Sequence, residues 1–142
     1  MIQIINDEYL LLKHDEDTLY FIYRDGSEYW GDLAWKQTLR KVLRLIEEEK
    51  IVNFYADRLN CHFIITPDLQ EWVADYITPK LIAAGLQKYV QVLPHELFSK
   101  VSGVQLAEES LKRKLIGQFE IQFFENRSDA LKWIGKPHDL YI

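Results

Sequence analysis

The 142-residue sequence has a single cysteine, Cys61, which excludes an internal disulfide bond. A lone thiol suits a reducing compartment, so we expect a cytoplasmic protein. The sequence has no apolar run near the ~18 residues that a membrane span needs. Its first residues, MIQIINDEYLLLKHDED, have neither the basic start nor the long apolar core of a signal peptide. We therefore expect no membrane span and no signal peptide.

Basic charge is also scarce, with 17 Lys and Arg residues against 22 Asp and Glu residues and a net charge of -5. No cluster of Lys and Arg stands without acidic residues nearby. Nucleic-acid binding needs a basic patch that neutralises phosphates, so we expect no nucleic-acid partner.

Motifs for cofactors, metals and catalysis are missing as well. The six glycines are scattered and form no phosphate-binding loop. The four histidines show no metal-ligand spacing; they are His14, His62, His95 and His138. Cys61 and His62 could suggest a nucleophile and a base, but adjacent residues in an extended segment rarely point toward each other. We expect a protein that is not an enzyme and holds no cofactor or metal.

The residues that are present indicate a globular protein, with 48% apolar and 27% charged residues. A chain of this length can bury roughly 70% of its unfolded surface, so we expect one domain over residues 1–142. Aromatic residues make up 13%, more than a minimal core needs. The four tryptophans are either core anchors or the walls of an apolar pocket; they are Trp30, Trp35, Trp72 and Trp133.

The order of the predicted elements is typical of an α/β fold. Residues 2–24 contain two or three short β-forming runs, close enough in sequence to pair only as an antiparallel meander. Strands and helices alternate after them, with Asp32, Thr66 and Asn126 predicted as helix N-caps. The predicted strands and helices after the meander are 33–49 (helix), 51–56 (strand), 67–77 (helix), 79–84 (helix), 88–93 (strand), a short helical turn near Leu97, 105–115 (helix), 118–124 (strand) and 127–134 (helix).

One predicted helix carries a basic row at i, i+4 spacing, formed by Lys36, Arg40 and Arg44. The row could dock an anionic partner. Alternatively, it is a solvated face whose arginines pair with acids such as Glu47 and Glu48.

The stretch from Ile51 to Ile77 predicts a buried strand, an irregular polar turn and a long amphipathic helix. A strand flanked by helices is typical of a parallel sheet, in which ligands gather at the carboxyl ends of strands. Four polar residues fall in this turn: Asp57, Arg58, Asn60 and His62. The Arg58 guanidinium could bind an anion. Alternatively, Asp57 caps a turn amide and Arg58 pairs with a neighbouring acid.

Two mutations bear on these alternatives. If Asp57 and Arg58 form a binding site, replacing either residue weakens binding and leaves the melting temperature nearly unchanged.

The apolar run Phe63-Ile64-Ile65 lies in the same turn region, and we expect it to form an exposed patch for a partner.

Several short motifs, in their order and spacing, resemble the STAS-like superfamily, specifically its sporulation stage II AA-like branch, which is related to anti-sigma-factor antagonists and CRAL-TRIO-type domains. They are the opening meander, Trp30-Gly31 before the first long helix, Asp57-Arg58 at a strand end, Pro67 with Trp72, Pro79 with Gly85, and Ala130 with Trp133-Ile134.

The resemblance implies a mixed sheet of about four to five strands, with helices packed mostly on one face, in a bacterial cytoplasmic protein. In anti-sigma antagonists a serine in the turn after the central strand is phosphorylated. Here the corresponding turn holds Asn60 and Cys61, and the chain has no serine between Ser27 and Ser99. The available hydroxyl is that of Thr66, which is predicted as a helix cap, so the sequence departs from the family pattern at the phosphorylation site.

Two functions remain open at this stage. The first is a non-enzymatic interaction or regulatory domain that binds a protein partner or forms a homodimer through the turn 57–65. The second is a carrier of an apolar or lipid-like small molecule, held between the helix 69–77 and the sheet. A cavity of ~300 Å³ or more lined by Trp72 and Tyr76 would favour the carrier.

Overall fold

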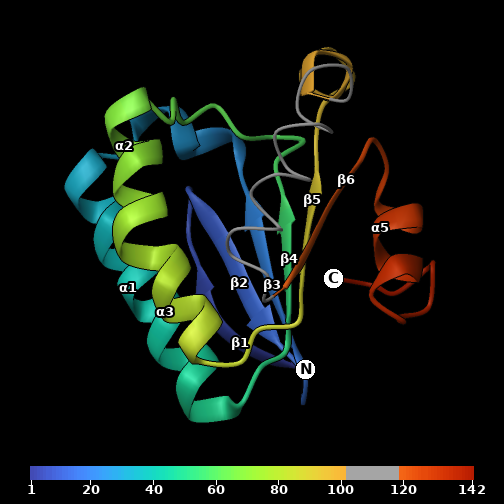
Figure 1. Ribbon diagram of the computed structural model, residues 1–142. Coiled ribbons are helices and arrows are strands. Elements are labelled where there is room, and N and C mark those ends of the chain that lie inside the picture. The colour runs from blue at the N-terminus through green and yellow to red at the C-terminus, as the bar shows by residue number, and fades with distance from the viewer. Residues whose placement is uncertain (102–118) are drawn as a thin grey trace.

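A six-stranded mixed sheet forms the centre of the computed structural model, which describes residues 1–101 and 119–142 (Figure 1). The strands lie side by side in chain order: β1 (Ile2–Asn6), β2 (Leu10–His14), β3 (Thr18–Tyr23), β4 (Asn53–Asp57), β5 (Lys88–Val92) and β6 (Glu120–Phe124). The first three strands are antiparallel, as the predicted meander requires, and β3 to β6 are parallel. The α/β class is confirmed. The expected four to five strands are wrong, because each of the six β-forming runs pairs into the sheet.

Most of the helices cover one face of this sheet (Figure 1). They are α1 (Asp32–Glu49), α2 (Pro67–Trp72), η2 (Val73–Ile77) and α3 (Thr78–Ala83), while α5 (Arg127–Trp133) lies on the opposite face. Residues 95–101 are also helical, and a short 3₁₀ helix, η1 (Asp25–Tyr29), follows β3. The connections from β3 to β4 and from β4 to β5 each add the next strand on the same side, so right-handed crossovers place their helices on one face. The predicted helix 105–115 lies outside the described residues.

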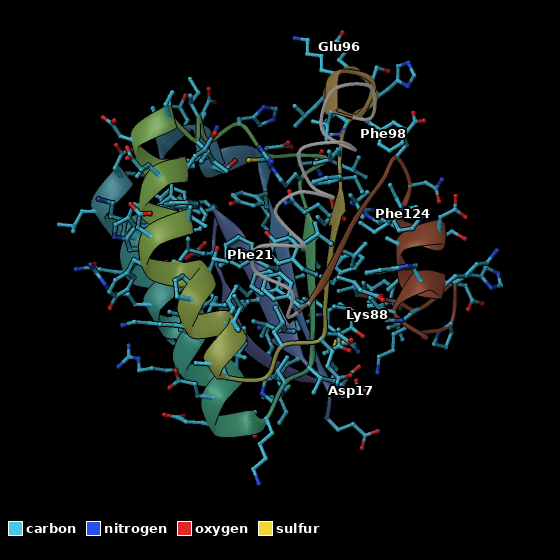
Figure 2. The ribbon with its side chains drawn as sticks, in the orientation of Figure 1. Asp17, Phe21, Lys88, Glu96, Phe98 and Phe124 are labelled. Atoms are coloured by element: carbon cyan, nitrogen blue, oxygen red, sulfur yellow. The ribbon has the colours of Figure 1, made fainter. Side chains whose placement is uncertain are left out.

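The two faces of the sheet carry two separate cores, and the alternation along β4 shows how they arise. Phe54 and Ala56 pack into the larger core under α1, α2 and α3. Tyr55 belongs to the smaller core under α5, because successive side chains of a strand point to opposite faces. Figure 2 shows the same division, with Phe21 toward the helical layer and Phe124 toward α5.

The helix ends follow the local sequence in most places. The Thr66 side chain accepts a hydrogen bond from the Leu69 amide (3.4 Å), and that of Asn126 accepts one from the Asp129 amide (2.9 Å), so both predicted caps are confirmed. Asp32 is not an N-cap: Gly31 holds that position, and Asp32 is the first helical residue. An acid there still favours the helix, because it lies near the positive end of the helix dipole.

The second helical segment differs from the prediction at Pro79. α3 (Thr78–Ala83) lies one residue earlier than the predicted helix 79–84, and the backbone stays right-handed helical through Ile77 and Thr78, with no capped break. The turn before it is the π-helical η2. Proline has no amide hydrogen and clashes with the carbonyl four residues earlier, so a wider turn lets the helix continue past it.

At the amino end of the parallel strands, Lys136 ties the segment after α5 to the turn between β2 and β3. Its Nζ lies 3.0 Å from Asp15 and 2.6 Å from Asp17. Burial works against ionisation of Asp15. Hydrogen bonds from Lys136, from the Asp17 and Thr18 amides and from the Tyr20 hydroxyl outweigh it and lower the pKa of Asp15 to about 2.

Candidate functional site

The loops that follow β3 and β4 are joined to each other at the carboxyl end of the sheet. The buried Ser27 hydroxyl accepts a hydrogen bond from the His62 amide (2.9 Å) and donates one to the Asn60 carbonyl (3.5 Å). The His62 ring lies 3.3 Å from the Asp25 carboxylate. Both Asn60 and His62 are exposed, so this surface offers the polar groups that the sequence predicted there.

Asp57 points to the face of the sheet that α5 covers, and its side chain is 2% exposed. One carboxylate oxygen accepts a hydrogen bond from the Leu59 amide at 3.0 Å, and the other forms an ion pair with Arg127. The hydrogen bond from Arg127 to Asp57 raises the pKa of Arg127. Asp57 therefore caps the turn amide, as one of the two alternatives proposed, and also binds α5 to the sheet.

Arg58 points to the opposite face, under the main helical layer. Its Nη1 donates to the Gln91 side-chain oxygen at 3.3 Å, while its buried Nε has no hydrogen-bond partner among the residues that the structure describes. Within residues 1–101 and 119–142, no carboxylate forms an ion pair with Arg58. The structure thus brings Asp57 and Arg58 to the same strand end but not to one site.

Cys61 lies close to Arg58, and burial raises the pKa of its thiol, an effect that the arginine charge only partly opposes. The thiol is therefore protonated at neutral pH and is a poor nucleophile. His62 points instead toward Asp25. These contacts agree with the expectation that the pair does not act as a nucleophile and base.

The apolar run of the turn divides into a buried and an exposed part. Phe63 is only 7% exposed, so the expectation that it forms part of an exposed patch is wrong. It lies between two tryptophans, with ring centroids 5.2 Å from Trp35 and 6.0 Å from Trp30. Ile64 is 77% exposed, as expected.

Sequence reasoning missed two other exposed apolar residues at this end, Tyr29 (77% exposed) and Leu33 (66% exposed). The exposure of Leu33 could have been predicted, because Leu33 lies off the buried i, i+3, i+4 stripe that Trp35 and Leu39 share on α1. The exposure of Tyr29 could not, because Tyr29 precedes a buried tryptophan in a stretch without periodicity.

Trp72 and Tyr76 stack on each other (5.4 Å between ring centroids) on the helical segment that packs against α1. Lys36 and Arg40 of α1 lie over the Trp72 ring at 5.2 and 5.5 Å, and Lys80 lies 3.9 Å from the Tyr76 ring centre. Hydrogen bonds from Lys80 and Arg40 lower the pKa of Tyr76. The two rings are half-buried and join the helices through cation–π contacts.

The same cation–π contacts involve two members of the basic row on α1, Lys36 and Arg40. No carboxylate of the described residues forms an ion pair with Lys36, Arg40 or Arg44, so the expected pairing with Glu47 and Glu48 is not observed. Lys36 and Arg40 instead form cation–π contacts, Lys36 with the Trp72 ring and Arg40 with the rings of Trp72 and Tyr76.

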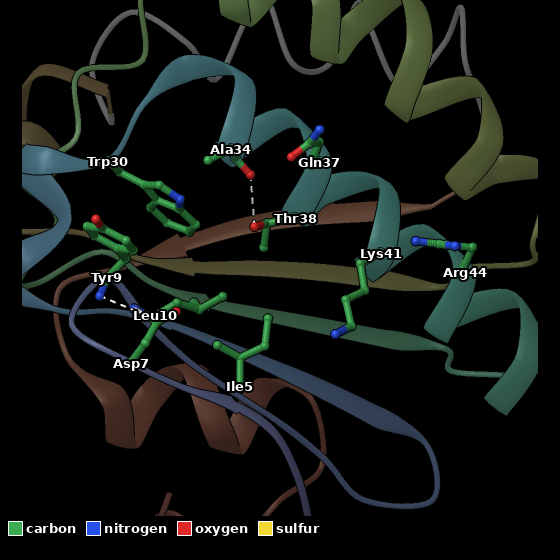
Figure 3. A pocket seen from close by; sticks show the side chains of 10 residues that line it. All are labelled: Ile5, Asp7, Tyr9, Leu10, Trp30, Ala34, Gln37, Thr38, Lys41 and Arg44. Carbon is green, nitrogen blue, oxygen red and sulfur yellow. Dashed lines mark hydrogen bonds between the residues drawn. The ribbon is translucent and has the colours of Figure 1, made fainter.

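A groove of about 360 Å³ lies between α1 and the edge of the sheet formed by β1 and β2 (Figure 3). Tyr9 and Trp30 stack in parallel in its wall, with ring centroids 5.5 Å apart. Its lining consists of Ile5, Asp7, Tyr9, Leu10, Trp30, Ala34, Gln37, Thr38, Lys41 and Arg44. Trp72 and Tyr76, which the carrier hypothesis required, are not part of this lining.

Within the described residues, no group of three or more histidine, cysteine or acidic side chains could hold a metal ion. No helix in that part of the chain is both long enough and apolar enough to cross a membrane. In comparisons with known proteins, no family model, no curated protein and no solved structure matches the chain. Its function therefore has to be inferred from geometry.

Proposed function

We propose that this protein is a non-enzymatic protein-binding domain with a STAS-like fold, and that its contact surface lies at the carboxyl ends of β3 and β4. The fold proposal is supported by the order of the elements: an antiparallel start, then parallel strands with helices mostly on one face. The six-stranded sheet is larger than the resemblance implies.

The observation that carries the binding proposal is the exposure of Tyr29, Leu33 and Ile64, at 77, 66 and 77%, on segments that contact one another at the carboxyl end of the sheet. Single exposed apolar residues are common on any protein surface. These three differ because each is one or two residues from a member of one buried aromatic cluster, in which Phe63 contacts both Trp30 and Trp35. We infer that the cluster holds the segments that carry the three side chains close to one another.

The charges around these residues indicate what kind of partner fits. Four exposed carboxylates lie on the same loops and helix starts; they are Asp25, Glu28, Asp32 and Asp68. Like charges repel across an interface, so a second copy of this chain is a poor match for this surface. The partner we propose is a different protein whose contact face is apolar at its centre and basic at its rim.

Site-specific photo-crosslinking in the source cell tests this proposal. A photoreactive phenylalanine analogue at Tyr29 or Ile64 should give a covalent adduct with the same protein, and Leu33→Asp should reduce that adduct. Tyr141, which is 90% exposed, is the matched control position. The proposal fails if Tyr29 and Ile64 give no common adduct, or if Tyr141 gives the same adducts.

A second candidate function, carriage of a small apolar molecule, is favoured by the groove between α1 and the sheet edge. Its volume of about 360 Å³ lies in the range of small-molecule sites. Native mass spectrometry of freshly purified protein distinguishes the two functions. A mass above 16.9 kDa by a few hundred daltons that is lost on denaturation supports the carrier, whereas the bare mass contradicts it.

A further inference from the structure

Arg58 holds a positive charge in a place where the described part of the protein supplies no negative one. Its side chain is half-buried at the carboxyl end of β4, and within residues 1–101 and 119–142 its Nε has no hydrogen-bond partner. A guanidinium stays charged at every physiological pH. Removing such a charge from water without a counter-charge costs stability, because the lost hydration is not replaced.

The groups around Arg58 are neutral and rich in hydrogen-bond donors. Burial raises the pKa of the Tyr23 and Tyr89 hydroxyls, and the charge of Arg58 opposes this rise only in part. Both hydroxyls are therefore protonated at neutral pH. The Tyr23 oxygen accepts from the Trp35 indole at 3.1 Å, which leaves its own proton available. The Gln91 oxygen accepts from Arg58, which leaves the amide NH₂ of Gln91 to donate.

The carboxylate nearest in sequence does not compensate this charge. Asp57 lies on the other face of the sheet, where Arg127 and the Leu59 amide occupy its two oxygens. The Arg58 cluster, defined as Tyr23, Arg58, Cys61, Tyr89 and Gln91, is thus a set of donors around one fixed cation.

We propose that the Arg58 cluster binds the anionic oxygen group of a small molecule, either a carboxylate or a phosphate. The planar guanidinium matches the geometry of both groups, and the hydroxyls of Tyr23 and Tyr89 and the amide of Gln91 complete the set of donors. The position agrees with the general rule that ligands of open α/β sheets bind at the carboxyl ends of parallel strands. The Arg58 cluster lies at the same end of the sheet as the proposed protein-binding surface but shares no residue with it, and it shares none with the lining of the groove beside β1.

The single cysteine of the chain is a reporter inside this cluster. Arg58 lowers the pKa of the Cys61 thiol, so an anion that neutralises Arg58 should raise it. Alkylation by iodoacetamide follows the thiolate fraction and slows about tenfold for each unit of pKa increase. The experiment measures this rate at pH 8 with inorganic phosphate, with acetate and with chloride alone, all at equal ionic strength.

We expect phosphate, acetate or both to slow alkylation in a saturable way in the unmodified protein. An effect of phosphate alone identifies a phosphate ligand, and an effect of acetate alone a carboxylate. Arg58→Lys should abolish the effect, because an ammonium lacks the planar pair of donors. Arg24→Lys is the matched control and should retain it, because Arg24 binds Asn6 and the Asp7 carbonyl instead.

A second variant and a second readout keep the test valid if Arg58→Lys does not fold. Gln91→Leu removes one donor of the cluster without removing a charge, and it should weaken the response to the anion several-fold. The melting temperature of the unmodified protein should rise with the effective anion, because a ligand that binds only the folded state stabilises it. Equal alkylation rates in all three salts, or an unchanged response in Arg58→Lys, overturns the proposal.

Discussion

Replacement of Asp57 by alanine should destabilise the protein strongly, because two contacts of a buried carboxylate disappear together. The Leu59 amide would lose its acceptor, and an unpaired buried amide costs about 1–3 kcal/mol. Arg127 would lose its ion-pair partner, but its side chain is 52% exposed and regains water, so this loss adds only about 1 kcal/mol. We therefore expect the free energy of unfolding to fall by about 2–4 kcal/mol. The sequence-based binding hypothesis led to the opposite expectation, a nearly unchanged melting temperature.

Thermal unfolding followed by circular dichroism measures this effect. At this chain length, each kcal/mol lowers the melting temperature by about 4 °C, so Asp57→Ala should melt roughly 8–16 °C below the unmodified protein. Arg127→Ala is the matched variant, because it removes the ion pair and keeps the bond to Leu59. The double variant should lose less than the sum of the single losses, since both changes break the same pair.

The result that would refute this reasoning is a melting temperature of Asp57→Ala within about 2 °C of the unmodified protein. Such a result would mean that water satisfies the Leu59 amide and that the contact between α5 and the sheet does not depend on the carboxylate. Asp57 would then again be a candidate binding residue.

Three further predictions concern other parts of the fold. Phe63→Ala should cost about 3–5 kcal/mol in urea unfolding, because it empties a space between two tryptophans, whereas Ile64→Ala on the exposed side should cost less than about 0.5 kcal/mol; similar losses for both would contradict the assigned burial. Lys136→Met should raise the pKa of Asp15 from about 2. Ionised Asp15 stabilises the protein above its unfolded pKa of 3.8, and this contribution is lost as the pH falls toward 2; the variant should therefore lose it at higher pH in an acid titration, and an unchanged acid transition would show that Lys136 is not the cause. Asn126→Ala should cost about 1 kcal/mol in thermal unfolding by removing the cap of α5, and an unchanged melting temperature would count against that cap.

The elements that the sequence predicted correctly depend on neighbours in the chain. The caps at Thr66 and Asn126 are decided within three residues, and alternation along β4 decides which side chains face which helix layer. The local β-forming runs allowed five or six strands, two or three of them in residues 2–24, whereas the family resemblance implied four to five; six are present in the described sheet.

The features that the sequence could not predict depend on distant contacts. Phe63 follows a polar turn and resembles an exposed residue until Trp30 and Trp35 are placed against it. Similarly, Asp57 and Arg58 were expected in the turn after a strand ending at residue 56, whereas β4 extends to Asp57. Their partners, Arg127 and Gln91, lie 70 and 33 residues away in the sequence.

The agreement between strand order and chain order has a consequence for how the protein is made. Every strand from β2 onward finds its pairing partner in the strand synthesised just before it, so the sheet can grow in one direction as the chain leaves the ribosome. Pairing between successive strands also shortens the loops that must close, which favours fast folding. The bonds from Lys136 to Asp15 and Asp17 join residues more than a hundred positions apart. They can form only after Lys136 has been synthesised, when all six strands have already left the ribosome.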